Sequence, residues 1–182
     1  MVQAAGKLTV LLLLLPGCAG SGPPRLTPIG DVIPADVSLE GRWKLQGAAS
    51  DTERRIRTSE YRSSGGQRGA DGPSVYVFLR TGGRLKITQT PYALFVSFDR
   101  SVVEEYRFRE HRLVNVGPIE ADRASGWADG KYVIQTLDRE GALLEESYAL
   151  EAGGDDVLLR TVTVTYRNEV VLSLQQSYEP LD

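Results

Sequence analysis

The stretch Arg160-Thr161-Val162-Thr163-Val164-Thr165-Tyr166 alternates strictly, with threonine at every second position. Successive side chains of a β-strand point to opposite faces, so the valines would share one face and the threonines the other. β-Branched residues are common in strands because they fit a pleated, half-buried surface. The stretch therefore predicts one strand of an antiparallel sheet that packs one face on a core.

The same alternation extends to both sides of this stretch. Turn-forming residues at 138–141, 152–155 and 167–169 separate the alternating segments. The last third of the chain is thus predicted to be an up-and-down succession of four strands: Lys131–Leu137, Ala142–Leu150, Val157–Tyr166 and Val170–Tyr178.

Earlier segments follow a similar pattern. Thr81-Gly82-Gly83 favours a hairpin between two of them, and Tyr92, Leu94, Val96 and Phe98 are expected to share a face. Arg54–Tyr61 is basic and would be an edge strand at best, and Glu120–Gly126 is ambiguous. The remaining predicted strands are Leu39–Leu45, Ser74–Arg80, Arg84–Thr90, Tyr92–Phe98, Val103–Phe108 and Arg112–Val116.

Beyond Val37 no segment shows a convincing helical period, and a parallel sheet would need crossover helices. About nine or ten strands with short connections favour an antiparallel up-and-down barrel, with a β-sandwich as the alternative. The predicted fold class is therefore all-β.

The N-terminus has the three regions of a secretory signal. Lys7 precedes an apolar run, Leu8–Leu15, and small residues precede Cys18, the only cysteine of the chain. The run is too short to cross a bilayer as a helix, which takes about 20 apolar residues. Leu15-Pro16-Gly17-Cys18 resembles the lipobox of bacterial lipoproteins, in which a peptidase cuts before the cysteine and the thiol carries a diacylglycerol. The competing interpretation is an ordinary signal peptide, with Cys18 incidental.

The resemblance divides the chain into a signal peptide (1–17), a Pro-rich flexible tether (18–36) and a barrel domain (37–182). Ala19, in place of aspartate after the cysteine, resembles lipoproteins that are sorted to the outer membrane. The expected location is thus the periplasmic face of the bacterial outer membrane, with the lipid on Cys18 as the membrane contact. A secreted or periplasmic protein is the alternative.

Composition argues against several chemistries. With one cysteine, assigned to lipid, no intrachain disulfide or cysteine-based metal site is expected. His111 is the only histidine and is expected in an exposed turn, so neither a zinc site nor a Ser-His-Asp triad is predicted. The net charge of −3 is well mixed, which argues against nucleic acid as a partner. No cofactor is expected, because no phosphate-cradling glycine loop precedes a helix.

Charged clusters leave two further possibilities open. Glu104-Glu105 and Glu145-Glu146 are adjacent on predicted strands and point to opposite faces, while Asp155-Asp156 lies in a turn. A glycosidase needs two acids that face each other, so a hydrolase would have to draw them from separate strands. The arginines between Arg54 and Arg68 could contact acidic headgroups, although a solvated segment is the favoured interpretation.

Gly41-Arg42-Trp43, on the first predicted strand, resembles the Gly-x-Trp signature of lipocalins, in which the tryptophan covers the closed end of a barrel. The block Trp127–Val133, followed by Tyr148 and Tyr178, resembles secreted bacterial proteins with lipocalin-like barrels. The second and third lipocalin motifs are not found. The resemblance implies a lipocalin-like barrel over residues 37–179. The candidate ligand-binding residues are Trp43, Tyr92, Phe98, Trp127 and Tyr132.

These observations lead to three functional hypotheses. The leading one is a non-catalytic binding module that holds a small apolar or amphipathic ligand in the barrel mouth. The second is a structural or assembly partner that offers a sheet edge to another envelope protein. The third is a hydrolase. The expectation is that the protein is not an enzyme.

Overall fold

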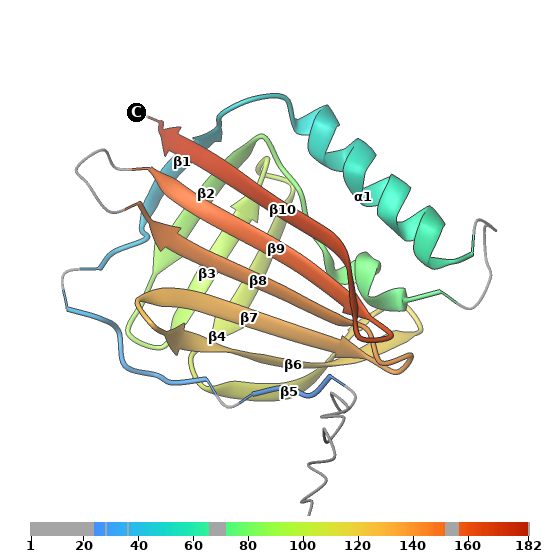
Figure 1. Ribbon diagram of the computed structural model, residues 1–182. Coiled ribbons are helices and arrows are strands. Elements are labelled where there is room, and N and C mark those ends of the chain that lie inside the picture. Colours follow the sequence, from blue (N-terminus) through green and yellow to red (C-terminus); the bar gives the residue numbers. More distant parts are fainter. Residues whose placement is uncertain (1–23, 28, 36, 66–71, 152–156, 182) are drawn as a thin grey trace, which may run out of the picture.

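A computed structural model describes residues 24–27, 29–35, 37–65, 72–151 and 157–181. Its ten strands form one antiparallel sheet in the order β4-β3-β2-β1-β10-β9-β8-β7-β6-β5, which curls into a nearly closed barrel (Figure 1). The strands are β1 (Gly41–Leu45), β2 (Arg84–Gln89), β3 (Ala93–Phe98), β4 (Val102–Arg107), β5 (Glu110–Val116), β6 (Ile119–Ala128), β7 (Lys131–Asp138), β8 (Leu143–Leu150), β9 (Leu158–Tyr166) and β10 (Glu169–Pro180). The predicted all-β, up-and-down barrel is confirmed, and the sandwich alternative is wrong because the strands share one sheet.

The barrel does not close between β4 and β5. These strands are consecutive in the chain, yet they are the two ends of the sheet and do not pair with each other. Near the turn that joins them, two side chains cross to carbonyl groups of β4. Ser125 Oγ donates to Arg107 O at 2.7 Å, and Arg112 Nη2 donates to Glu105 O at 3.2 Å. The opening therefore lies toward the far ends of β4 and β5.

The structure corrects the prediction of an edge strand at residues 54–61. These residues belong to a helix, α1 (Ala49–Ser63). Its ion pairs have helical spacing, Arg54 with Asp51 at 2.8 Å and Arg57 with Glu53 at 3.5 Å. Only Ser59 of this helix is buried. The helix therefore has almost no apolar face, and its sequence lacks the apolar period that marks an amphipathic helix.

The position of α1 follows from the short length of β1. The pairing of β1 with β10 reaches only Tyr178, Glu179 and Pro180. Helix α1 runs beside the earlier part of β10 (Figure 1), where Arg55 Nη2 and Ser59 Oγ donate to Ser173 O and Val171 O, each at 2.7 Å. The helix thus satisfies backbone groups on β10 that no strand pairs with there.

The predicted strand at residues 74–80 is also wrong. Residues Ser74–Phe78 form a 3₁₀ helix, η1, whose Val75, Tyr76 and Phe78 are buried. The Asp138 carboxylate accepts hydrogen bonds from Val75 N at 2.8 Å and Ala142 N at 2.7 Å, which fixes η1 against β7. Since η1 does not pair with β2, the predicted hairpin through Gly82-Gly83 is wrong as well. A short apolar run does not by itself distinguish a strand from a buried helical turn.

The side chains inside the barrel form two apolar clusters. The first cluster packs around Trp43, whose Nε1 donates to Leu39 O at 3.2 Å, so this buried indole has the partner that its burial requires. The second cluster packs around η1 and includes Val162, Val164 and Leu174. The first cluster consists of Leu39, Trp43, Leu45, Leu85, Ile87, Leu94, Val96, Phe98, Tyr106, Trp127, Tyr132, Ile134, Tyr148, Leu158 and Tyr178.

Arg160 lies in the interior with the buried Glu146 and Gln176. Arg160 Nε and Nη2 donate to Glu146 Oε2, and Nη1 donates to Gln176 Oε1 at 3.2 Å. The same guanidinium donates to Arg80 O at 2.8 Å and stacks over the rings of Phe98 and Tyr148. Charged side chains therefore form part of the barrel interior.

Part of the segment expected as a tether contacts the barrel. Gly30 and Trp127 exchange two backbone hydrogen bonds, with N···O distances of 3.1 and 2.9 Å. Thr27 N donates to Gln135 Oε1 at 2.8 Å, and Ile29 is buried. The signal peptide, Cys18, the glycine-rich stretch at 66–71 and the turn at 152–156 lie outside the described residues. Within the described residues, no helix is long and apolar enough to span a membrane.

The backbone contact between Gly30 and Trp127 requires a glycine at position 126. A Cβ atom at Gly126 would lie 2.1 Å from Gly30 O, so the Gly126→Ala variant should lose the Gly30–Trp127 bridge. We expect hydrogen exchange at the Trp127 amide to accelerate by about tenfold or more. Gly83→Ala is the matched control, because its Cβ would meet only ordinary contacts at 3.9 Å. Unchanged protection of Trp127 in Gly126→Ala would contradict this account.

Candidate functional site

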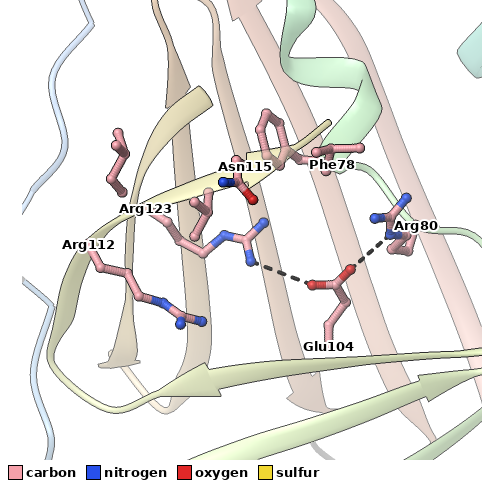
Figure 2. A pocket seen from close by; sticks show the side chains of 9 residues that line it. Phe78, Arg80, Glu104, Arg112, Asn115 and Arg123 are labelled. Atoms are coloured by element: carbon pink, nitrogen blue, oxygen red, sulfur yellow. Dashed lines mark hydrogen bonds and ion pairs between the residues drawn. The ribbon is translucent and has the colours of Figure 1, made fainter. Parts of the chain in front are cut away.

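A pocket of about 290 Å³ lies beside the opening between β4 and β5. Figure 2 shows its polar side chains, which come from four parts of the chain. Val114 and Val116 of β5 add an apolar wall on the face that also carries Arg112, whereas Leu113, which is 58% exposed, points to the other face at the rim. The other lining residues are Phe78, Arg80, Glu104, Arg112, Asn115 and Arg123.

Arg123 is the most buried charge of the pocket, with a side chain only 5% exposed. Ala121 and Ser125, which stand two positions before and after Arg123 on β6, lie on the same face of the strand and are also buried. Arg123 Nε donates to Thr136 Oγ1 at 3.2 Å. Its guanidinium carbon lies 5.9 Å from the centre of the Phe78 ring and 5.3 Å from that of Tyr106, within cation–π range.

Glu104 of β4 is shared by two arginines across the opening. Arg80 Nε donates to Glu104 Oε1 at 2.8 Å, whereas Arg123 Nη1 lies 3.6 Å from Oε2. The first distance is that of a charge-assisted hydrogen bond and the second exceeds it. Figure 2 marks both interactions. Glu104 therefore binds Arg80 closely and Arg123 only loosely.

Arg112 of β5 lies directly opposite Arg123 in the pairing of β5 with β6. Its Nε is 3.0 Å from Oε2 of Glu110, and its side chain is 44% exposed. The pocket and its nearest ion-pair partners thus contain three guanidinium groups, from Arg80, Arg112 and Arg123, and two carboxylates, from Glu104 and Glu110. One positive charge is left in excess.

The tyrosine beside the pocket is held in its neutral form. Burial raises the pKa of Tyr106 well above its ordinary value, and the charge of Glu146 acts in the same direction. A phenol with such a pKa does not act as a base at neutral pH. Among the described residues, no group of three His, Cys, Asp or Glu side chains could hold a metal ion. The polar groups that the pocket offers are guanidinium, carboxylate and amide groups.

The structure gathers four of the five sequence-predicted ligand residues in one place. Trp43, Phe98, Trp127 and Tyr132 all belong to the first apolar cluster, where the Trp127 and Tyr132 rings meet edge-on at 5.4 Å. Tyr92 lies apart from them. It precedes β3 and is 74% exposed. The prediction that Tyr92 shares a face with Leu94, Val96 and Phe98 is therefore wrong, because those three side chains are buried.

Sequence reasoning missed the arginines of the pocket. The only available signal was Arg123, which stands between the small residues Ala121 and Ser125 at every second position of a segment that was left ambiguous. The acidic pairs behave as expected for strands. Glu104 lines the pocket while Glu105 binds Arg107, and Glu146 is buried while Glu145 accepts from Gln135. His111 is exposed, but it lies on β5 and not in a turn.

Comparisons with known proteins give a fold and no family. The sequence matches no protein-family model and no curated protein. Lipid binding protein 8 of Caenorhabditis elegans superimposes with a TM-score of 0.51 at 15% identity, over 81% of this chain and all of that one. This likeness shows the fold alone, an antiparallel up-and-down β-barrel.

Two other solved structures are somewhat less similar. Fatty-acid-binding protein 1 of Echinococcus granulosus gives a TM-score of 0.49 at 12% identity, over 79% of this chain and 98% of that one. A secretory abundant heat soluble protein of Ramazzottius varieornatus also gives 0.49, at 11% identity, over 79% and 95% of the two chains.

Proposed function

We propose that the protein is a membrane-anchored, non-catalytic binding module for a small amphipathic ligand. The ligand's polar head would occupy the pocket between β4 and β5. The observation that carries the proposal is the composition of this pocket, in which excess positive charge lies beside an apolar wall of β5. A ligand with a polar head and an apolar tail matches both surfaces.

The packing of the interior favours this pocket over the barrel mouth. In the part of the chain that the structure describes, η1 and the aromatic side chains of the first apolar cluster occupy the interior. Trp43, Phe98, Trp127 and Tyr132 then act as packing residues that hold the strands beside the opening in place. The similar barrel from Caenorhabditis elegans is a lipid binding protein by name, which agrees with the proposal.

Native mass spectrometry tests the ligand. After incubation with a cell-envelope lipid extract, the protein should carry one additional lipid-sized mass. Val114→Ser should retain that mass about three- to tenfold less well, because Val114 lines the pocket on the same face of β5 as Arg112 and loses apolar contact. Val170→Ser is the matched control, with an exposed aliphatic side chain outside the pocket. A protein that emerges without any bound lipid would contradict the proposal.

The membrane anchor is tested separately at Cys18. In Cys18→Ala the lipoprotein peptidase should leave the signal uncleaved, because the acceptor thiol for the lipid is missing. The protein should then no longer fractionate with the outer membrane as a processed lipoprotein. Ser21→Ala, in the segment after the cysteine, should be processed normally. Unchanged processing and membrane association of Cys18→Ala would support the alternative of a secreted or periplasmic protein.

A further inference from the structure

Two arginines face each other directly on the inner face of the sheet. Arg112 of β5 and Arg123 of β6 are register partners, and both line the pocket between β4 and β5. Like charges at directly opposed positions of neighbouring strands destabilise a sheet. Figure 2 shows both side chains extending into the pocket from the same part of the barrel wall. This arrangement needs negative charge between or beside the two guanidinium groups.

The resident carboxylates supply only part of that charge. Glu110 is adjacent to Arg112 at 3.0 Å, and Glu104 holds Arg80 at 2.8 Å while staying 3.6 Å from Arg123. The remaining interactions of Arg123 are one hydroxyl, from Thr136, and the faces of two aromatic rings. Burial of a charge is costly unless it is paired and hydrogen-bonded. Arg123 is thus a buried cation with an incomplete set of partners.

We propose that the pocket binds a phosphate group, carried either by a lipid headgroup or by a free organic phosphate. This inference rests on the proposed function, because it identifies the polar head of the ligand. A guanidinium group binds phosphate through two parallel N–H···O bonds. A phosphate offers enough oxygen atoms for Arg112 and Arg123 together. The volume of about 290 Å³ accommodates a headgroup and leaves the tail against the apolar wall of β5.

The test is a ³¹P NMR titration of the full-length protein with inorganic phosphate and with hexyl phosphate. Arg112→Gln should weaken binding of both probes about tenfold, since it removes a charged donor. Glu104→Gln should tighten binding, because it removes a negative charge that competes for Arg123 at nearly constant shape. Arg54→Gln is the matched control, an exposed arginine of α1 with a single carboxylate partner.

The outcomes separate this inference from the proposed function. Tighter binding of hexyl phosphate than of inorganic phosphate indicates that the phosphate belongs to a lipid. Equal binding of the two probes indicates a soluble phosphate. That result would support the phosphate site and contradict the proposed amphipathic ligand. Neutral hexyl glucoside should bind much more weakly than hexyl phosphate. If it binds equally well, or if Arg112→Gln binds phosphate as the unmodified protein does, the phosphate site is overturned and the proposed amphipathic ligand is not.

Discussion

Replacing Arg160 by methionine should lower the free energy of unfolding by about 3–5 kcal/mol. Arg160 is fully buried, and its guanidinium donates to Glu146, to Gln176 and to the carbonyl of Arg80. The substitution leaves the Glu146 carboxylate buried without its cation. The cost therefore comes mainly from the uncompensated charge that remains, and urea unfolding of the full-length protein measures it.

A second variant shows whether the loss of stability comes from the unpaired Glu146 carboxylate or from lost packing. Arg160→Met combined with Glu146→Leu removes both charges, so it should regain most of the lost stability. Arg57→Met is the matched control, because Arg57 pairs with Glu53 on the exposed side of α1. That pair is solvent-screened, and its loss should change stability by less than about 1 kcal/mol. A single Arg160→Met variant as stable as this control would refute the explanation.

The second substitution with a large effect is Asp138→Ala, which should cost about 2–5 kcal/mol. The carboxylate of Asp138 accepts hydrogen bonds from the backbone of Val75 and of Ala142. Both N–H groups would become unsatisfied in a buried position, at roughly 1–3 kcal/mol each. Because Val75 starts the buried part of η1, we expect η1 to detach first. Hydrogen exchange at the Val75 amide and urea unfolding measure the two effects.

The same carboxyl group predicts a dependence on pH. Burial raises the pKa of Asp138 above its ordinary value of 3.8, against the opposing effect of the Ala142 and Val75 N–H groups. The folded state then binds the proton more tightly than the unfolded state does. Stability should fall as pH rises from about the ordinary pKa through the raised one. In Asp138→Asn this decline should be absent, so its stability deficit should narrow over that range. A deficit that is constant with pH would contradict the shift.

The strands were predictable because their signal is local. From β7 to β10 each strand carries its own alternation and ends at its own turn, and the observed bounds differ from the predicted ones by two residues at most. Helix α1 was missed because its stability comes from contacts with β10 and from ion pairs along its surface, which leave no apolar stripe. The five residues of η1 have the composition of a strand, and the contact that holds them as a helical turn, between the Val75 N–H and Asp138, joins residues far apart in the sequence.

The pocket could not be predicted for a different reason. Arg112 and Arg123 are distant from Arg80 in the sequence, and only the register of β5 with β6 places the first two opposite each other. Register depends on the turn after β5, where Gly117 has a positive φ of 59°. Glu104 joins them only because β4 and β5 leave the barrel wall open. Sequence alternation assigns a side chain to a face of the sheet and does not say which side chains meet there.

The attachment of Gly30 to Trp127 limits how far the barrel could stand from a bilayer. If Cys18 carries lipid, nine peptide units separate it from Thr27, which already contacts β7. Even a fully stretched chain of that length reaches only about 30 Å. Asp31 pairs with Arg109 at the turn between β4 and β5. The short segment between Cys18 and Thr27 would therefore keep this end of the barrel close to the lipid headgroups and restrict rotation of the barrel above them.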